Sequence, residues 1–513
     1  MTLDQAIAAL PRAYPGPGGA VAVLRQGEVL ARHAWGWANA ERRIPFTPAT
    51  LFRMCSVTKQ FTCALLLDAC PDPQAWDGDV RGRLPLLEGP APGVLHLCHN
   101  QSGLRDYWAV AMLHGFPAEA PFGDAEAARV IGRARTLQFA PGAQYSYSNG
   151  NFRLLSDILQ ERTGRSFAEL LRTRVFGPAG IGSAFLAADT RAMPDGTEGY
   201  EGTAATGFRP AVNQVIWTGD AGLGASLDDM VAWERFVDAT RDDAGGLYRR
   251  LSAPVSFADG TAAEYGFGLA QRPALGRPAT GHGGALRGWR SHRVHLAGER
   301  VSVVVLFNHL SDAHAAATDV LGAVLGEDAT RPDAALPAPP WLGAYVDEAT
   351  GLSARLDMAG PGEVRLRYGH SPERLPLQPD GTAGRDGTRL QPAPGGLHMR
   401  RPGENTAALL RPCPGDAAPD MAGRYRCAEL DAALTVADAG GALYGAFSGM
   451  GGEGRIEQLE PAGPDVWALP CPRALDHTPP GDWTLRVRRE GGVVAGLQVG
   501  CWLARGLEYA RVG

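Results

Sequence analysis

Several common features are missing from this sequence, and each absence argues against a class of protein. Its 513 residues contain no run that approaches the ~20 consecutive apolar residues of a membrane-spanning helix. The first residues, Met1–Ala6, include no basic segment and begin no long apolar one, so we predict no export signal and expect a cytoplasmic protein. No cluster of lysine and arginine occurs and the formal net charge is −6, which argues against a nucleic-acid surface.

The sparse cysteines and histidines argue against two further classes. The eight cysteines include no C-x-x-C pair, so we expect reduced, mostly buried thiols and no disulfide framework. The histidines show neither an H-E-x-x-H motif nor a Cys/His ligand spacing, so we expect no metal and no other cofactor. Glycines cluster between residues 220 and 230 without the spacing of a phosphate-binding loop, and we interpret this stretch as a tight turn that lines a pocket.

The composition is that of an ordinary globular protein, with 45% hydrophobic and 20% charged residues, and the chain is long enough for several domains. Residues 19–24 and 29–36 are predicted to form a β-hairpin, residues 60–250 mostly helix and loop, and residues 280–307 further strands of the same sheet. Strands and helices are therefore segregated, which indicates an α+β fold with an antiparallel sheet beside a cluster of helices.

Lysine is nearly absent, so the lysine at position 59 stands out. Ser56 and Lys59 form an S-x-x-K pair just before an apolar stretch, residues 64–67, that predicts a buried helix. Positions i and i+3 share one face of a helix, so the amine would lie beside the hydroxyl. A serine hydroxyl needs an adjacent base, and a buried lysine can lose its proton near neutral pH. The pair predicts a serine nucleophile, although an isolated S-x-x-K also arises by chance.

A second polar stretch contains Tyr147 and Asn149. It follows a Pro-Gly turn and precedes a helix that we predict to start at about Phe152. A phenol that faces an ammonium group can become partly phenolate and exchange protons with the serine. Tyr145 is an alternative for this role but lacks the following asparagine. Taken alone, the simpler interpretation is that Tyr147 packs as a loop aromatic and Asn149 caps the helix.

A third stretch, Gly281–Gly284, places a histidine among glycines in a predicted edge strand. Glycines weaken a strand and often mark a place where another backbone or a ligand approaches closely. We therefore interpret His282 as part of a strand that lines a substrate site. A plain histidine at a strand end is the alternative interpretation.

In this order and context, the three stretches resemble the motifs of the serine penicillin-recognising family, which includes class C-type β-lactamases, DD-peptidases and related esterases. The resemblance covers residues 1–325 and implies a β-lactamase/transpeptidase-like fold, with β-lactams as candidate inhibitors. The catalytic residues that it implies are Ser56, Lys59 and Tyr147, and the substrate-binding residues are Asn149, His282 and Gly284.

The third motif, which contains His282, indicates one particular group within this family. Penicillin targets often have lysine where this chain has His282, and a mostly neutral histidine holds a substrate carboxylate less well than lysine does. The D-aminopeptidase group of the family is similar to this chain in having His-Gly-Gly, and it cleaves from the amino end. The resemblance therefore implies hydrolysis of an N-terminal D-amino acid.

The rest of the chain is similar to that group in its organisation. Residues 331–340 are predicted to be a proline-rich linker. Residues 341–345 and 421–425 then begin two segments with similar patterns, a weak internal repeat. Short alternating runs and glycine turns predict that each is a small antiparallel β-barrel. The predicted division is a hydrolase domain over residues 1–330, the linker, and barrels over residues 341–415 and 416–513.

A proline-rich stretch of the last barrel, residues 470–483, contains Asp476. It is similar to the D-aminopeptidase loop that enters the active site, so the resemblance implies that Asp476 binds the free α-ammonium of the substrate. A carboxylate in a closed pocket favours an amine and rejects a carboxylate tail. From the residues alone, a surface hairpin with a solvated aspartate is the simpler interpretation.

We therefore expect a serine aminopeptidase that removes an N-terminal D-amino acid such as D-alanine from small peptides, amides or esters, through an acyl-enzyme on Ser56. No cofactor, nucleic acid or membrane is expected as a partner, and a homodimer is a candidate assembly. A β-lactamase, an esterase and a D-Ala-D-Ala carboxypeptidase are alternatives that use the same centre. A catalytically inactive ligand-binding protein is a hypothesis of another class, which the intact motif set disfavours.

Overall fold

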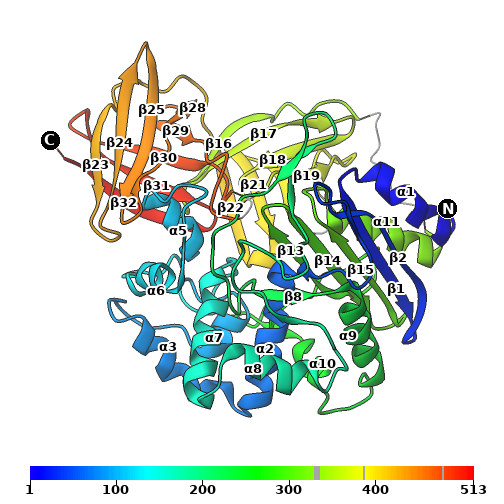
Figure 1. Cartoon of the computed structure of the whole chain (residues 1–513). Helices are drawn as coiled ribbons and strands as arrows, with labels where there is room; N and C mark the ends of the chain where they lie inside the picture. The colour runs from blue at the N-terminus through cyan, green and yellow to red at the C-terminus, as the bar shows by residue number, and fades with distance from the viewer. Residues whose placement is uncertain (328–335, 385–386, 477–478, 513) are drawn as a thin grey trace.

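The structure, a computed structural model, describes residues 1–327, 336–384, 387–476 and 479–512. Its N-terminal part is built on an eight-stranded antiparallel sheet in the order β11-β12-β13-β14-β15-β1-β2-β3, seen on the side of the N-terminus in Figure 1. These strands are β1 (Gly18–Arg25), β2 (Glu28–Asn39), β3 (Ile44–Pro45), β11 (Tyr265–Gly266), β12 (Leu269–Ala270), β13 (Thr280–Leu286), β14 (Trp289–Leu296) and β15 (Val301–Phe307).

Helices cover both faces of this sheet. Helices α1 and α11 lie on the outer face, and the remaining helices gather on the other side (Figure 1). The helices are α1 (Leu3–Ala13), α2 (Thr58–Ala69), α3 (Asp77–Arg83), α4 (Val94–Cys98), α5 (Tyr107–Leu113), α6 (Asp124–Gly132), α7 (Asn149–Thr163), α8 (Phe167–Leu170), α9 (Leu227–Ala239), α10 (Leu247–Leu251) and α11 (Ala313–Leu325). There are also the 3₁₀ turns η1 (Cys55–Val57), η2 (Pro73–Trp76) and η4 (Pro402–Glu404) and the π-helical segment η3 (Leu171–Phe176).

The sequence of β1 explains why helices pack on both faces of the sheet. Alternate residues of a strand point to opposite faces. Ala20 and Ala22 belong to the main core on the side of α2, whereas Val21 and Val23 pack in a separate cluster with α1 and α11. Because both faces are buried, the strand is a continuous apolar run, and the predicted α+β arrangement is confirmed.

Short strands connect the helices of the N-terminal part. One small sheet, in the order β4-β8-β5, brings the segment before η1 against the glycine-rich turn near residue 222. The strands outside the large sheet are β4 (Phe52–Arg53), β5 (Phe185–Leu186), β6 (Tyr200–Thr203), β7 (Gly207–Pro210), β8 (Leu223–Ala225), β9 (Val255–Ser256) and β10 (Ala262–Ala263).

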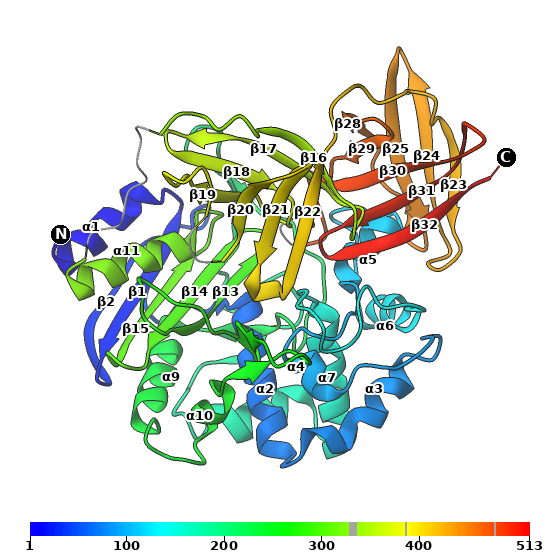
Figure 2. The ribbon, with the colours of Figure 1, turned by 180° about the vertical axis from the view of Figure 1, so that it is seen from behind.

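Two curled antiparallel sheets follow, and we call them the middle barrel and the C-terminal barrel (Figure 2). The middle barrel has β16 (Gly343–Asp347), β17 (Ser353–Gly360), β18 (Glu363–Arg367), β19 (Glu373–Pro376), β20 (Arg389–Ala393), β21 (Gly396–Arg401) and β22 (Thr406–Pro412). The C-terminal barrel has β23 (Gly423–Cys427), β24 (Ala432–Ala439), β25 (Ala442–Gly449), β26 (Gly452–Glu453), β27 (Glu457–Gln458), β28 (Glu460–Gly463), β29 (Val466–Leu469), β30 (Trp483–Glu490), β31 (Val493–Cys501) and β32 (Ala504–Val512).

The weak repeat in the sequence corresponds to equivalent strands. In the middle barrel β16 pairs with β17 and β22, and in the C-terminal barrel β23 pairs with β24 and β32. Both first strands also begin with a glycine at a positive φ of about 150°, Gly343 at 143° and Gly423 at 154°. The two barrels therefore start from the same local geometry.

Residues 331–335 of the predicted linker lie outside the described residues, and residues 336–340 precede β16 without forming a helix or strand. All eight cysteines are free thiols, six of them buried, as predicted. Across the described ranges, no helix is both long and apolar enough to cross a bilayer.

Candidate active site

Three groups that the sequence singled out converge at the junction of η1, α2 and the loop before α7. The Nζ atom of Lys59 lies 3.0 Å from the Oγ atom of Ser56. The phenol of Tyr147 donates a hydrogen bond of 2.7 Å to the same Oγ atom. Ser56 is 4% exposed and Lys59 is fully buried. A hydroxyl, an amine and a phenol from distant parts of the chain therefore share one buried position.

The local backbone explains how Ser56 is presented. It lies in the 3₁₀ turn η1, immediately before α2. The i, i+3 spacing of Ser56 and Lys59 implied instead that both residues belong to the helix. Cys55 before it has a φ of 53°, in the left-handed region that L-residues seldom adopt. Such strain persists only where the surrounding structure enforces it, and it is common at functional sites.

Strand β13 holds this strained backbone in place. It packs directly against η1. A Cβ atom on Gly284 would collide with the carbonyl of Met54 and the hydroxyl of Ser291, so only glycine allows the strand to approach so closely. Ser291 of the paired strand β14 donates a hydrogen bond of 2.9 Å to the Met54 carbonyl. The strand glycine therefore marks a close approach of two backbones, as the sequence indicated.

Lys59 is the only lysine in the sequence, and oxygen atoms of uncharged groups accept its hydrogen bonds. Its Nζ atom donates to Oδ1 of Asn149 at 2.9 Å and to the carbonyl of Asp220 at 2.7 Å. The Tyr147 ring centroid lies 4.8 Å away. Burial lowers the pKa of Lys59 to about 8, against the opposing attraction of the Asp220 and Asp106 carboxylates. A neutral amine is therefore accessible at mildly alkaline pH.

Burial shifts the pKa of Tyr147 in the opposite direction to that of Lys59. Burial raises the pKa of its phenol well above the ordinary value, and the hydrogen bond to Ser56 opposes the shift only in part. The phenolate suggested by its nearness to lysine is therefore disfavoured, and the neutral phenol is a proton donor. The alternative, Tyr145, packs with its ring 5.4 Å from that of Tyr265 and 6.3 Å from that of Trp502.

Asn149 is the first residue of α7, whose start was predicted three residues later, at about Phe152. The early start has a physical cause. The carboxylate of Asp106, from a different segment, accepts a hydrogen bond of 2.9 Å from the main-chain N–H of Asn149. The same carboxylate accepts one of 2.8 Å from the Asn149 side-chain amide. The helix is therefore capped from outside, and Asn149 is not its own cap.

His282 lies in β13 with its Nε2 atom 3.0 Å from the hydroxyl of Tyr265. Burial, with a smaller contribution from Lys59, lowers the pKa of His282 to about 3. The imidazole is therefore neutral across the physiological range. Its ring centroid lies 6.3 Å from that of Tyr147, and a neutral ring there does not attract a substrate carboxylate.

Asp476 lies in a segment of the C-terminal barrel, Pro470–Asp476, that leaves β29 and that we call the strap. Its buried carboxylate accepts hydrogen bonds from the Thr190 hydroxyl at 2.6 Å and from the N–H groups of Gln214 and Val215 at 3.1 Å each. Burial raises its pKa. It forms no hydrogen bond with any of the three converging groups, all of which are described. The structure therefore brings the strap onto the N-terminal part, and the ammonium-binding role stays a prediction.

The strap ends beside the strand that packs on η1. The N–H of Arg287, at the end of β13, donates a hydrogen bond of 2.7 Å to the Asp476 carbonyl. The guanidinium of Arg287 also donates to the carbonyl of Ala474. The strap is thus held against the edge of the candidate site, although its aspartate side chain turns toward residues 190–215.

Two carboxylates near Lys59 belong to none of the sequence motifs. Asp106 follows a glycine-containing turn and precedes the apolar helix α5, which is a typical helix-cap signal. Asp220 stands in the glycine-rich turn that was interpreted as structural, and its carboxylate accepts a hydrogen bond of 2.7 Å from the Tyr107 hydroxyl. Local patterns identified caps and turns, but not which distant group each would contact.

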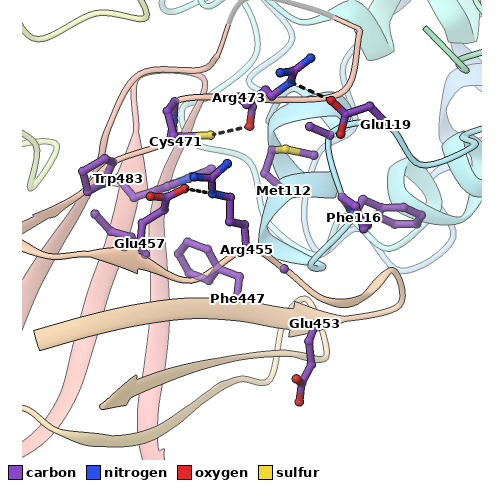
Figure 3. A pocket seen from close by; sticks show the side chains of 16 residues that line it. Met112, Phe116, Glu119, Phe447, Glu453, Arg455, Glu457, Cys471, Arg473 and Trp483 are labelled. Carbon is purple, nitrogen blue, oxygen red and sulfur yellow. Dashed lines mark hydrogen bonds and ion pairs between the residues drawn. The ribbon is translucent and has the colours of Figure 1, made fainter. Parts of the chain in front are cut away.

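A cavity of about 340 Å³ lies on another side of the strap, between α5 and the C-terminal barrel (Figure 3). Its walls include Met112, Phe116 and Trp483, and Arg473 forms an ion pair with Glu119 across it at 2.8 Å. None of the predicted site residues lines this cavity. Among the residues that the structure describes, no group of three potential metal ligands gathers anywhere.

Comparisons with known proteins agree with this architecture. A family model described as β-lactamase matches residues 3–325, and one described as D-aminopeptidase, domain B, matches residues 334–510. A D-aminopeptidase of Gluconobacter oxydans (strain 621H) is 60% identical over 523 residues, which cover 99% of this chain and 98% of the relative. A D-aminopeptidase of Brucella melitensis biotype 1 is 47% identical over 512 residues, covering 100% and 99%.

Solved structures share the fold at low sequence identity. An octameric penicillin-binding protein homologue from Pyrococcus abyssi superposes with a TM-score of 0.55 at 19% identity, covering 86% of this chain and 97% of the other. A D-amino acid amidase from Ochrobactrum anthropi SV3 superposes with a TM-score of 0.51 at 20% identity, covering 63% and 99%. These likenesses support the β-lactamase-like arrangement of sheet and helices.

Proposed function

The chain belongs to the D-aminopeptidase family, and from this premise we propose that it is a serine hydrolase that removes an N-terminal D-amino acid, such as D-alanine, from peptides, amides or esters. The observation that carries the proposal is the convergence of Lys59 Nζ and the Tyr147 phenol on Ser56 Oγ, at 3.0 and 2.7 Å. These are distances at which protons can be exchanged with the nucleophile.

In the proposed mechanism, Ser56 attacks the substrate carbonyl and neutral Lys59 takes its proton. The lowered pKa of Lys59, about 8, supports this role, because a useful base has a pKa near the operating pH. Neutral Tyr147 then gives its proton to the departing amine. The ammonium group of Lys59 returns a proton to the Tyr147 phenolate, so both side chains are neutral again. The resulting ester of Ser56 is hydrolysed by water, which returns the free enzyme.

The carbonyl oxygen needs hydrogen-bond donors as negative charge develops on it. We assign these to the N–H of Ser56 and to that of Ala285 in β13. The close packing of β13 on η1, which the glycine at position 284 permits, supports this assignment. Asn149 positions Lys59 and faces the substrate, and His282 with Gly284 forms the neighbouring wall. No step requires a cofactor.

Preference for a free amine is the second element of the proposal. The neutral His282 disfavours substrates that end in a carboxylate at this position. The main chain of Asp476 lies beside the end of β13, with its carboxylate bound to the segment 190–215. We propose that Asp476 attracts the α-ammonium of the substrate. We also propose a cytoplasmic homodimer, with β-lactams as inhibitors that acylate the same serine.

The deciding experiment compares hydrolysis of D-Ala-p-nitroanilide with that of N-acetyl-D-Ala-p-nitroanilide. The proposal expects efficient cleavage of the first and little of the second. Equal or faster cleavage of the blocked substrate would favour the esterase, β-lactamase or carboxypeptidase alternatives. L-Ala-p-nitroanilide is the control for stereochemistry, and the Ser56→Ala variant is the control for the nucleophile.

A further inference from the structure

Asp106 is a fully buried carboxylate that caps two helices at once. As the N-cap of α5, its Oδ1 atom accepts a hydrogen bond of 2.8 Å from the N–H of Trp108. Its Oδ2 atom accepts hydrogen bonds from the main-chain N–H and the side-chain amide of Asn149, at 2.9 and 2.8 Å. A buried charge is costly unless it is well paired, so this carboxylate is held by three donors in a fixed geometry.

The bond to the Asn149 amide determines which way that amide faces. With its nitrogen bound to Asp106, its Oδ1 atom is left to accept from Lys59 Nζ at 2.9 Å. An amide in the reverse orientation would direct its N–H groups toward the ammonium and its oxygen toward the carboxylate, and both contacts would be repulsive. Asp106 therefore fixes the acceptor that holds Lys59 beside Ser56.

The position of Asp106 is itself fixed by the C-terminal barrel. The N–H of Asp106 donates a hydrogen bond of 3.0 Å to the carbonyl of Leu503, in the turn between β31 and β32. Two residues further on, Trp108 Nε1 donates one of 2.6 Å to the carbonyl of Leu475 in the strap. Figures 1 and 2 both show α5 directly against the red strands of this barrel.

We propose that Asp106 is a positioning residue for the catalytic lysine, and that the C-terminal barrel, by anchoring α5 at Leu503 and Leu475, holds it in place. The barrel is then part of the scaffold of the catalytic centre and not only the carrier of a specificity loop. This inference rests on the proposed function for the reaction that it affects, but the geometry of Lys59 can be tested without any substrate.

The electrostatics around Lys59 make the test specific. Asp106 and Asp220 are the carboxylates that act on it, both favouring the ammonium form, and the other titratable neighbours are Cys55, Cys63, Tyr147 and His282. Burial raises the pKa of Asp106 to about 6, so it is an anion at pH 8. Removing that negative charge destabilises the ammonium, and the pKa of Lys59 must fall below its wild-type value.

Because Lys59 is the only lysine, enzyme labelled with ¹³C and ¹⁵N in lysine alone gives a single side-chain resonance that titrates with this amine. In the Asp106→Asn variant we expect that resonance to titrate at lower pH than in the wild type. We also expect kcat for D-Ala-p-nitroanilide to fall about 100-fold with KM little changed, the cost of a slightly misplaced catalytic group. The pH at which kcat/KM reaches half its maximum should move down with the lysine resonance.

Asp312→Asn is the matched control. Asp312 also caps a helix through its carboxylate, accepting from the N–H groups of His314 and Ala315 at 2.9 and 3.0 Å, but at α11 on the outer face of the sheet. We expect its lysine titration and kcat to equal those of the wild type. If the Asp106→Asn variant keeps wild-type kcat and an unshifted lysine resonance, Asp106 is only a structural cap and the proposal is wrong.

If Asp106→Asn does not fold, Trp108→Phe tests the anchoring, because it removes the bond to the Leu475 carbonyl and leaves the carboxylate intact. We expect kcat to fall several-fold with a broadened lysine resonance; wild-type values for both would overturn the proposal.

Failure of the proposed function would give a different pattern of results. The wild type would then not cleave D-Ala-p-nitroanilide. The lysine resonance of the Asp106→Asn variant would still titrate at a lower pH than that of the wild type.

Discussion

Tyr345 of the middle barrel and Tyr425 of the C-terminal barrel occupy equivalent places in the first strand of each. Tyr345 donates a hydrogen bond of 2.6 Å to the carbonyl of Trp341, four residues earlier, and Tyr425 donates one of 2.5 Å to that of Met421. The paired strands on either side are also equivalent. The two barrels therefore share a scaffold that was built twice in one chain.

Their connections differ. In the middle barrel, the described residues of the connection between β19 and β20 fold back on the barrel, where Ala383 bridges Leu377 and Leu390. In the C-terminal barrel, the connection after β29 departs as the strap and reaches the end of β13, and the β31–β32 turn contacts Asp106. Both barrels therefore reach the N-terminal part, but at different places. The C-terminal barrel contacts Asp106 and the end of β13, whereas the middle barrel contacts the loop before α7, where the Glu404 carbonyl accepts a hydrogen bond of 3.2 Å from the N–H of Tyr145.

The largest expected effect comes from Trp502→Ala, compared with His370→Ala. These rings lie 5.6 Å apart, one from each barrel, but Trp502 is buried and donates a hydrogen bond of 3.0 Å to Glu404, whereas His370 is exposed. Removing the buried indole should lower the free energy of unfolding by ~3–5 kcal/mol, and removing the exposed ring by less than about 1 kcal/mol. Urea denaturation of both variants measures this; equal losses would mean that the barrels contribute alike.

A smaller effect, on selectivity, is expected from Asp476→Ala compared with Asp347→Ala. Both aspartates are buried and accept three hydrogen bonds; those of Asp347 come from Ala349, Thr350 and Tyr368. Asp476→Ala should reduce the ratio of kcat/KM for the free over the N-acetylated substrate by about 10- to 100-fold, the equivalent of one charged hydrogen bond. Asp347→Ala should lower stability without changing that ratio, and a matching change in both would remove the strap from the account of specificity.

The smallest effect is expected where the barrels are alike. Tyr345→Phe and Tyr425→Phe each remove one phenol hydrogen bond to a main-chain carbonyl, so each should lower the free energy of unfolding by about 1 kcal/mol. Neither should alter kcat. Thermal unfolding together with steady-state kinetics checks both statements, and a loss of activity confined to Tyr425→Phe would extend the functional difference into the shared scaffold.

Much of the fold could be predicted from the sequence because its signals are local. The hairpin of β1 and β2 and the strands after residue 280 both follow from apolar periodicity and turn residues. The weak repeat was visible because both barrels keep the same spacing of aromatic and glycine residues. The family motifs also placed the serine, the lysine and the tyrosine in contexts that the structure brings together.

What could not be predicted depends on contacts between distant segments. The start of α7 at Asn149 depends on the Asp106 carboxylate, which is forty-three residues away in the chain. The left-handed backbone at Cys55 depends on the packing of β13. The environment of Lys59 depends on a carbonyl of the glycine-rich turn. No local sequence pattern encodes these features, because each depends on a contact with a residue that is distant in the sequence.

The most direct test of the account is to identify the covalent intermediate. The enzyme is mixed with a D-alanine ester, quenched with acid within milliseconds to seconds, digested and analysed by mass spectrometry. The account predicts one D-alanyl group on Ser56, reduced in the Lys59→Ala variant and absent with the N-acetylated ester. Turnover of the D-alanine ester without any adduct on Ser56, or with the adduct on another residue, would contradict it.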